Sequence, residues 1–576
     1  MKPALELTDS RRLTGANLFW DRPSAIIDVR IDAPGRAGYE KEVFAAWREA
    51  ATLLLEQVGH GGEDTCHRFF DGGASFLISA PIDALYSMCE LNEIAWERAV
   101  AQMTAAALPD LEVQVSRLRT LFGEEARPGL LAMQEAAKAH DVPFLWDDDE
   151  VSIGYGTTAQ VWPYEDVPDA HHIDWTGVGT IPAALVTGTN GKSTTVRMAA
   201  AIIEAAGKNA GLTSTDWIRV GRKILDTGDY SGTGGARTLM RHPETEIAVL
   251  ETARGGLLRR GLGLERADAA LITNVAADHL GDYGINTVPE LREAKFIVRR
   301  ALGTGGCLLL NADDPGMVEF AAGLETPVLW FGLEPGRSPL RDHLAAGGTA
   351  AYLDQGWLML SAAGESRRVV AVHAIPAALD GAARHNVQNA LGAMLLCHQL
   401  GIEQPALRRG LEAFRGDETD NPGRGNWFSG NGVRILVDFA HNEHGMRALA
   451  GMLKEVPAQR RILLMGQAGD RPDEDIERLT RAACQMQPSR LMACELPGYE
   501  RGRAPGETQG IIARAAATAG VDAQCVHLFD SPVAAAAEAL AEARAGDLLV
   551  FLALSQRQEV LDLVHRYIGD QVEAES

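Results

Sequence analysis

The stretch that decides the fold runs Ala184-Leu185-Val186-Thr187-Gly188-Thr189-Asn190-Gly191-Lys192-Ser193-Thr194-Thr195. An apolar strand over 183–187 leads into a glycine-rich turn, and a helical pattern follows over 196–206. This order of strand, turn and helix is typical of a phosphate-binding P-loop. Backbone N–H groups would face the phosphates, Lys192 would reach the β- and γ-phosphate oxygens, and the Ser193 hydroxyl would ligate Mg²⁺. Val186 stands where the general pattern has glycine, so we expect a shorter subtype; the alternative is an ordinary glycine turn before a helix.

Apolar runs on both sides of the P-loop predict an α/β fold. Strands buried on both faces of a sheet are continuous apolar runs, and such runs alternate with helical patterns after residue 181. The expected strands lie at 183–187, 247–251, 270–275, 307–311 and 328–331, and then at 435–439, 462–465, 491–494, 525–529 and 548–552. The very regular alternation in the second group predicts a doubly wound, Rossmann-like parallel sheet.

Changes in sequence pattern predict three domains. Residues 1–170 form an N-terminal α+β domain with helices expected at 43–58, 83–103 and 127–140, and we find no catalytic motif there. A linker with two prolines is expected at 162–179. Residues 171–403 form the central P-loop α/β domain and residues 404–576 the C-terminal Rossmann-like domain. Docking of a substrate or a partner is the most economical role for the first domain.

Composition and charge exclude several classes of function. Lys and Arg number 54 against 78 Asp and Glu, a net charge of −24 that disfavours nucleic acid or an anionic membrane surface as the main partner. The seven cysteines form no C-x-x-C pair, which is typical of reduced thiols in a cytoplasmic protein. The start has no signal-peptide pattern, and no apolar run approaches the roughly 18 residues that span a bilayer. We therefore expect a cytoplasmic protein.

Two strand ends carry candidate cation ligands. Glu251 closes the apolar run at 247–251, and Asp278-His279 lies in the loop after the run at 270–275. Ligands bind at the carboxyl ends of the strands in such sheets, so these side chains should lie near the P-loop. A lone histidine is more often structural, and the position of His279 on a strand-end loop is what favours a functional role.

The ordered motifs resemble those of the Mur ligase superfamily. They are Gly188–Thr195, Glu251–Gly256, Thr273-Asn274, Asp278–Gly281, Asn311–Pro315, His385-Asn386 with Asn389, Pro422–Arg424 and Asp438–Asn442. Further strings resemble the Mur-like part of the cyanophycin synthetase family, namely Gly228–Arg237, Gly469–Arg471 and Arg501–Glu507, with 11–18 and 153–156 in the N-terminal region. That family has an ATP-grasp domain between its N-terminal and Mur-like parts, and here only about two dozen residues separate Tyr155 from the P-loop strand.

The resemblance implies ATP and Mg²⁺ as cofactors and assigns roles to residues. Gly188, Thr189, Asn190, Gly191, Lys192, Ser193 and Thr194 would bind the nucleotide phosphates, Arg424 would face them, His385, Asn386 and Asn389 would lie on the adenine side and Asp438 at the ribose. Ser193, Glu251 and His279 would hold Mg²⁺. Lys295 stands where several members carry a carbamylated, metal-binding lysine; the alternative is an exposed helical lysine. Lys192, Glu251, His279, Arg424 and Lys295 would be the catalytic set.

Several arginines are candidates for substrate binding. Arg501 and Arg503 follow the strand at 491–494, and two guanidiniums in the interdomain cleft would suit a substrate carboxylate. The alternative is that both are solvated loop charges. Arg254, Arg237 and His441 are the other candidates from the resembling motifs. Thr233 and Gly235 replace the proline and serine expected in the loop 228–237, and Glu443 replaces the proline that commonly follows Asp-x-Ala-His-Asn.

The sequence favours an ATP-dependent ligase that activates a carboxylate as an acyl phosphate and couples it to an amino acid or amine. The substrate would be an aspartate-containing or cyanophycin-related acidic peptide, supplied by a separate ATP-grasp enzyme. One alternative is a non-catalytic ATP-binding scaffold for a partner biosynthetic enzyme; another is a folylpolyglutamate or poly-γ-glutamate type of ligase. The resemblance also implies a homo-oligomer, a dimer or larger.

Overall fold

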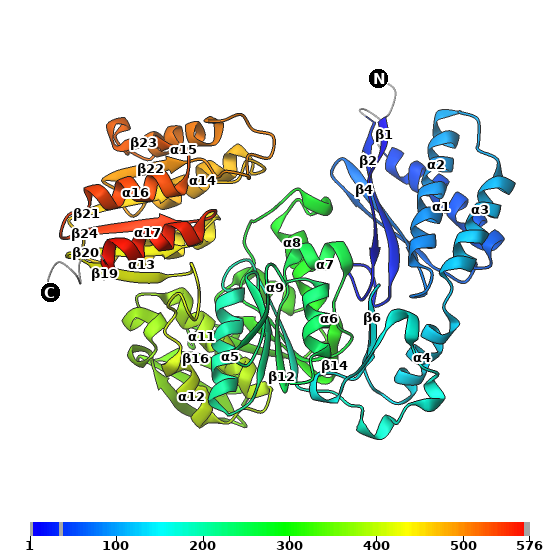
Figure 1. Cartoon of the computed structure of the whole chain (residues 1–576), viewed down its shortest axis with the longest axis horizontal. Coiled ribbons are helices and arrows are strands. Elements are labelled where there is room, and N and C mark those ends of the chain that lie inside the picture. The colour runs from blue at the N-terminus through cyan, green and yellow to red at the C-terminus, as the bar shows by residue number, and fades with distance from the viewer. Residues whose placement is uncertain (1–3, 34–37, 570–576) are drawn as a thin grey trace.

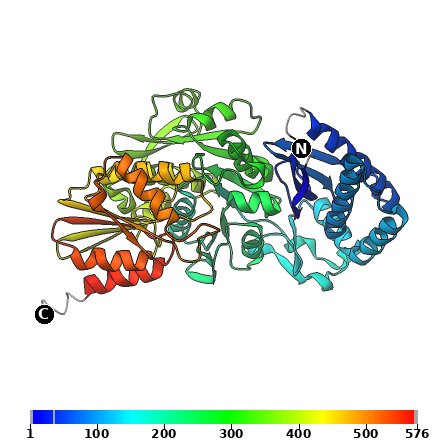
Figure 2. The ribbon, with the colours of Figure 1, turned by 90° about the horizontal axis from the view of Figure 1, so that it is seen from above.

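A computed structural model describes residues 4–33 and 38–569 of the chain. The predicted domains 1–170 and 404–576 also include residues 1–3, 34–37 and 570–576, which lie outside the described residues. Three regions, each built on its own main sheet, follow one another along the chain, and the central one lies between the other two (Figures 1 and 2). The predicted boundaries near residues 170 and 403 stay predictions.

The N-terminal region (β1 to β7) is an antiparallel sheet covered by helices. Its sheet has the order β1-β2-β4-β3, and a small sheet of order β5-β6-β7 follows. The strands are β1 (Ala4–Leu13), β2 (Ser24–Asp32), β3 (Thr65–Phe70), β4 (Gly73–Ser79), β5 (Phe144–Trp146), β6 (Glu150–Ile153) and β7 (Gln160–Pro163), and the helices α1 (Tyr39–Val58), α2 (Leu85–Thr104), α3 (Leu111–Glu125) and α4 (Pro128–Ala139). The sequence reading missed α3. Residues 164–182 contain only short 3₁₀ turns, in line with the linker expected at 162–179.

The central region (β8 to α12) is an eleven-stranded sheet of order β11-β10-β9-β12-β8-β13-β14-β15-β16-β17-β18. Its inner strands, from β9 to β16, are parallel. The strands are β8 (Ala183–Thr187), β9 (Ala210–Thr213), β10 (Trp217–Val220), β11 (Lys223–Thr227), β12 (Ile247–Glu251), β13 (Ala267–Ile272), β14 (Leu302–Asn311), β15 (Val328–Gly332), β16 (Ala350–Asp354), β17 (Trp357–Ala362) and β18 (Glu365–Ala371).

Helices cover both faces of the central sheet, so its parallel strands are buried on both sides as predicted. They are α5 (Lys192–Ala205), α6 (Thr233–Arg241), α7 (Arg254–Arg260), α8 (Val288–Lys295), α9 (Pro315–Ala321), α10 (Leu340–Ala345), α11 (Arg384–Gln399) and α12 (Gln404–Ala413). Val249 packs in the cluster with α5, α11 and α12, while its neighbour Leu250 packs in the cluster with α6, α7 and α8. The strand expected at 270–275 ends three residues early, because Thr273 and Asn274 turn to bond the P-loop.

The C-terminal region (β19 to α17) is a six-stranded sheet of order β19-β20-β24-β21-β22-β23, parallel except for the β19–β20 pair. The strands are β19 (Asn426–Gly430), β20 (Val433–Asp438), β21 (Arg460–Met465), β22 (Arg490–Cys494), β23 (Val526–Phe529) and β24 (Asp547–Leu552). The helices are α13 (Glu443–Lys454), α14 (Asp473–Cys484), α15 (Glu507–Thr518), α16 (Pro532–Glu542) and α17 (Arg557–Gly569). Hydrophobic clusters on both faces confirm the predicted doubly wound arrangement.

Candidate functional site

The P-loop joins β8 to α5 and is held by its neighbours. Gly188 and Gly191 have φ values of 146° and 86°, a conformation that favours glycine. A Cβ atom at Gly191 would lie 2.3 Å from the side-chain oxygen of Asn389, so the close approach of α11 also requires glycine there. The Thr273 hydroxyl donates a hydrogen bond to the Asn190 carbonyl oxygen at 2.6 Å. The loop is therefore fixed before any ligand binds.

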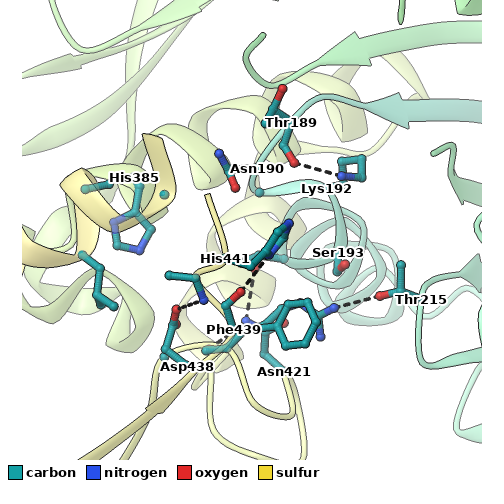
Figure 3. A pocket seen from close by; sticks show the side chains of 18 of the residues that line it. Thr189, Asn190, Lys192, Ser193, Thr215, His385, Asn421, Asp438, Phe439 and His441 are labelled. Atoms are coloured by element: carbon teal, nitrogen blue, oxygen red, sulfur yellow. Dashed lines mark hydrogen bonds between the residues drawn. The ribbon is translucent and has the colours of Figure 1, made fainter. Parts of the chain in front are cut away.

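A cavity of about 990 Å³ opens in front of the P-loop, between the central and C-terminal regions. Figure 3 shows the labelled P-loop residues facing Asp438 and His441 of the C-terminal region across this space. The cavity brings together most of the residues predicted from sequence: Thr189, Asn190, Gly191, Lys192, Ser193, Thr194, Glu251, His279, His385, Asn386, Asn389, Arg424, Asp438, His441 and Arg501. Gly188, Arg237, Arg254, Lys295 and Arg503 do not line it.

Glu251 carries the clearest sign of a cation site. It ends β12, next to β8, and is 2% exposed. Neither of its carboxylate oxygens has a hydrogen-bond partner among the described residues. An unpaired buried carboxylate is costly, and the cost is removed when a cation binds it. Because Glu251 and Ser193 line the same cavity, the oxygen ligands present there fit Mg²⁺.

Asp278, His279 and His441 form a second group of possible metal ligands. Their ligand atoms all lie within 4.8 Å of one another, and His441 comes from the C-terminal region. Burial would raise the pKa of Asp278, but the hydrogen bond and charge of His441, together with His279 and Arg471, hold that pKa well below its usual range. Burial lowers the pKa of His279 to about 4, so its imidazole is neutral near pH 7. His279 also has a φ of 50°, a strained conformation for a residue other than glycine.

An ion-pair cluster in the cavity wall was missed by the sequence reading. Asp216, just after β9, pairs with Arg197 of α5, with Arg424 at 2.8 Å and with Arg557 of α17 at 2.8 Å. Its side chain is 7% exposed. The signal that identified Glu251, a carboxylate at the carboxyl end of a strand, could also have identified Asp216. The predicted phosphate ligand Arg424 is thus held against the central region.

Polar residues at the start of α11 and the end of β20 line the far side of the cavity. Burial lowers the pKa of His385 to about 4, with a smaller contribution from His444. Asn386 and Asn389 are joined by a side-chain hydrogen bond of 3.2 Å. Burial raises the pKa of Asp438 to about 6, against several backbone N–H donors that favour its charged form. Their predicted nucleotide roles stay predictions.

Two lysines approach the P-loop from different sides. Lys192 donates to the Thr189 carbonyl oxygen at 3.0 Å, as Figure 3 shows. Lys295 of α8 donates to the Gly188 carbonyl oxygen at 2.8 Å and is 4% exposed. Burial, and then the charge of Lys192, lower the pKa of Lys295 well below its usual value. The alternative of an exposed helical lysine is therefore wrong, while carbamylation stays a prediction.

The guanidiniums of Arg237, Arg254 and Arg503 lie outside the cavity lining, and each is held by partners within the protein. Arg237 is 6% exposed and donates to the hydroxyl of Thr14 in the N-terminal region at 2.9 Å. Arg254 bonds the backbone oxygen of His279 and pairs with Asp282.

Arg503 donates to backbone oxygens of the loop 469–471 and pairs with Asp473 and Glu507. Its side chain is 15% exposed, so the reading of a solvated loop charge is wrong for this arginine. Arg501 lines the cavity, is half-exposed and pairs with Asp470.

The central and C-terminal regions are two α/β units that share one cleft, with a P-loop and a buried carboxylate at a strand end on its central side. Together these features define a nucleotide-binding protein. Sequence comparison identifies its family. Residues 186–397 match the Mur ligase middle domain, and residues 423–553 match the Mur ligase glutamate ligase domain, which together make up more than half of the chain. The chain belongs to the Mur ligase superfamily, whose members are ATP-dependent carboxylate–amine ligases that use ATP with Mg²⁺.

Two relatives matched by sequence agree with this assignment. The chain is 36% identical over 334 residues to a cyanophycin synthetase of Synechocystis sp., a match that covers 58% of this chain and 38% of that protein. It is 28% identical to a UDP-N-acetylmuramate–L-alanine ligase of Stenotrophomonas maltophilia, over 48% of this chain and 52% of the relative. A solved structure of E. coli FolC in complex with DHPP and ADP has a TM-score of 0.47 at 18% identity, covering 68% of this chain and 89% of that one.

The described ranges 4–33 and 38–569 contain no helix that is both long and apolar enough to cross a membrane.

Proposed function

We propose that this chain joins an amino acid or small amine to a carboxylate of an aspartate-containing acidic peptide, at the expense of ATP. The observation that carries the proposal is the single cavity that gathers the P-loop, Glu251, His279, Arg424 and Asp438 between two regions of the chain. The identity to cyanophycin synthetases favours an aspartate-containing peptide. Since the match covers little more than a third of that relative, the substrate belongs to the proposal.

In the proposed reaction the substrate carboxylate attacks the γ-phosphorus of ATP, the bond to the β–γ bridging oxygen breaks, and ADP leaves. The amine then attacks the carbonyl carbon of the acyl phosphate, a proton leaves the nitrogen, and phosphate departs. Both steps build negative charge on oxygens, which preorganised cations stabilise. Lys192 and Arg424 would supply fixed positive charge, and Ser193, Glu251 and His279 would hold Mg²⁺, which neutralises phosphate charge when bound. The C-terminal region would keep water from the acyl phosphate.

The test is ADP release from Mg-ATP in the presence of a panel of aspartate-containing peptides and amino acids. Productive pairs should drive ADP release, and Lys192→Ala should reduce it by about 10²-fold or more, as expected for loss of a transition-state charge. Lys223→Ala, an exposed lysine on β11, is the matched control and should keep full turnover. If no combination drives turnover while Mg-ATP still binds, the ligase proposal fails for those substrates. For a catalyst, Lys192→Ala should lose turnover while binding of a partner enzyme survives; a wild-type chain that binds a partner enzyme but shows no turnover to lose would favour the scaffold alternative.

A further inference from the structure

Arg471 reaches from the C-terminal region to the cation residues of the central region. It lies between β21 and α14 and is 9% exposed. Its Nη2 atom lies 2.7 Å from Nε2 of His279, and its Nη1 atom 3.3 Å from the Oδ1 atom of Asp278. No other part of the mechanism above uses this arginine.

The loop that carries Arg471 is braced by a second arginine. Arg503 donates from Nε to the Gly469 carbonyl oxygen at 2.8 Å and from Nη2 to the Arg471 carbonyl oxygen at 2.6 Å. Its remaining charge is met by Asp473 at 2.7 Å and Glu507 at 2.8 Å. The two motifs therefore act together: Arg503 of the motif 501–507 holds the loop 469–471 in the conformation in which Arg471 extends across the cleft.

The contact between Arg471 and His279 fixes the state of the imidazole. A guanidinium has only donors, so Nε2 of His279 must accept with its lone pair, and the ring proton of the neutral imidazole lies on Nδ1. Nε2 lies 4.0 Å from the Oδ1 atom of Asp278, whereas Nδ1 lies 3.9 Å from the Oδ2 atom of Asp282. A metal ion shared by His279 and Asp278 would therefore need the same Nε2 lone pair. One lone pair cannot serve both, and the positive charge of Arg471 also opposes a cation at Asp278.

We propose that Arg471 is a positioning residue that exchanges with the cation at His279: the guanidinium holds Nε2 until a cation takes it, and Arg471 then withdraws with its loop. The proposal rests on the proposed function, because it takes His279 as a cation ligand. The two contacts of Nε2 compete, so their free energies are linked. Interactions that stabilise the contact between Arg471 and His279 weaken cation binding, and a bound cation weakens the contact of the C-terminal region with the cleft. The exchange would thus couple loading of the cation to the position of the loop 469–471.

The test measures binding of Mn²⁺ by electron paramagnetic resonance, with a non-hydrolysable ATP analogue present and without turnover. Arg471→Gln removes the competing charge and should tighten Mn²⁺ binding by about tenfold, the scale expected for one nearby unit charge in a partly screened site. Arg471→Lys keeps the charge on a single donor group and should fall between wild type and Arg471→Gln. Arg481→Gln, on α14 of the same region, removes an exposed arginine paired with Glu477 and should leave Mn²⁺ affinity unchanged.

His279→Gln separates the possible failures. It should weaken Mn²⁺ binding, and if it does not, His279 holds no cation and the exchange is refuted. If His279→Gln weakens binding while both Arg471 variants bind Mn²⁺ as wild type does, or more weakly, the exchange is refuted although the cation site stands. Absence of ADP release from wild type with every substrate pair would instead count against the proposed function, and the Mn²⁺ comparison does not depend on that result.

Discussion

Replacing Asp216 by asparagine tests whether the buried ion-pair cluster joins the two halves of the cleft. The carboxylate pairs with arginines from three parts of the chain: Arg197 on α5, Arg424 before β19 and Arg557 on α17. Asparagine keeps the size and can still accept a hydrogen bond, but it leaves three guanidiniums facing one another without the charge that gathers them. We therefore expect a large loss of stability rather than the small change that follows a surface substitution.

The magnitude follows from burial and charge. Removing one partner of a buried ion pair costs about 3–5 kcal/mol, which for a unit of 150–250 residues lowers the unfolding midpoint by roughly 6–20 °C. Burial alone would raise the pKa of Asp216, but Arg424, Arg197 and Arg557 hold it well below its usual range. A carboxyl with a lowered folded-state pKa stabilises the protein above its unfolded pKa of about 3.9, and this stability is lost as the pH falls through the folded-state value. The difference between wild type and Asp216→Asn should therefore hold from pH 8 to pH 5 and narrow below about pH 4.

Differential scanning calorimetry across this pH range provides the measurement. Glu365→Gln is the matched control, because it breaks the exposed pair with Arg367, whose side chains are 69% and 66% exposed. Exposed pairs contribute little to stability because solvent screens them, so this control should unfold within a few degrees of wild type. If Asp216→Asn is no less stable than Glu365→Gln at pH 7, the three arginines are not held by Asp216 and the reasoning is refuted.

Three further predictions concern Glu251, Asp438 and Arg68. Glu251→Gln should abolish ADP release, measured by the turnover assay. It should also raise the unfolding midpoint of the metal-free protein, because an unpaired buried carboxylate costs about 1–3 kcal/mol. Thermal unfolding with and without Mg²⁺ measures this second effect, and a variant less stable than wild type would contradict the assignment. Burial raises the pKa of Asp438 to about 6, and hydrogen-bond donors of a bound nucleotide would favour the charged form of its carboxyl group. ADP affinity should therefore rise from pH 5 to pH 7, and calorimetry should detect protons released on binding. Asp438→Asn should lose this pH dependence. Arg68→Ala should lower ADP release severalfold. The reason is that Arg68 of β3 supports the segment after His279: it donates to the Gly284 carbonyl oxygen at 2.9 Å and pairs with Glu290. Arg22→Ala, which removes an exposed pair with Asp64, should leave ADP release unchanged.

Features that depend on neighbouring residues could be predicted from the sequence. The strand expected at 183–187 has the bounds of β8, because an apolar run, a glycine turn and a helix start specify one another locally. Glu251 could be placed at the cleft by a topological rule, since carboxyl ends of parallel strands meet at one edge. Helix α3 was missed because most of its residues are exposed, which leaves too few buried apolar residues to give a clear helical pattern.

Features that depend on partners far along the chain could not be predicted. Asp216 and Arg557 are 341 residues apart, and no local pattern relates them. The same holds for Arg471 and His279, which are 192 residues apart. Long side chains add a second uncertainty: Arg503 lies on the predicted loop, yet its guanidinium turns to the backbone of the loop 469–471. The sequence motifs therefore identified the loop that carries Arg503, but only the structure shows which atoms its guanidinium contacts.

The charge of the whole chain and the charge of the cleft have opposite signs, and distance decides which one governs binding. A net charge of −24 repels a nucleotide, but at physiological salt its field is screened beyond about 8 Å. The cavity lining carries five cationic side chains, Lys192, Arg384, Arg424, Arg501 and Arg557, against the four carboxyl groups of Asp216, Asp229, Glu251 and Asp438. Buried Arg197, which pairs with Asp216, adds a further positive charge behind the lining. The pairs with Asp216 hold Arg197, Arg424 and Arg557 in place at short range, where screening is weak. We therefore expect recognition of the triphosphate to depend on these local cations, while the acidic surface slows its approach without weakening the bound state.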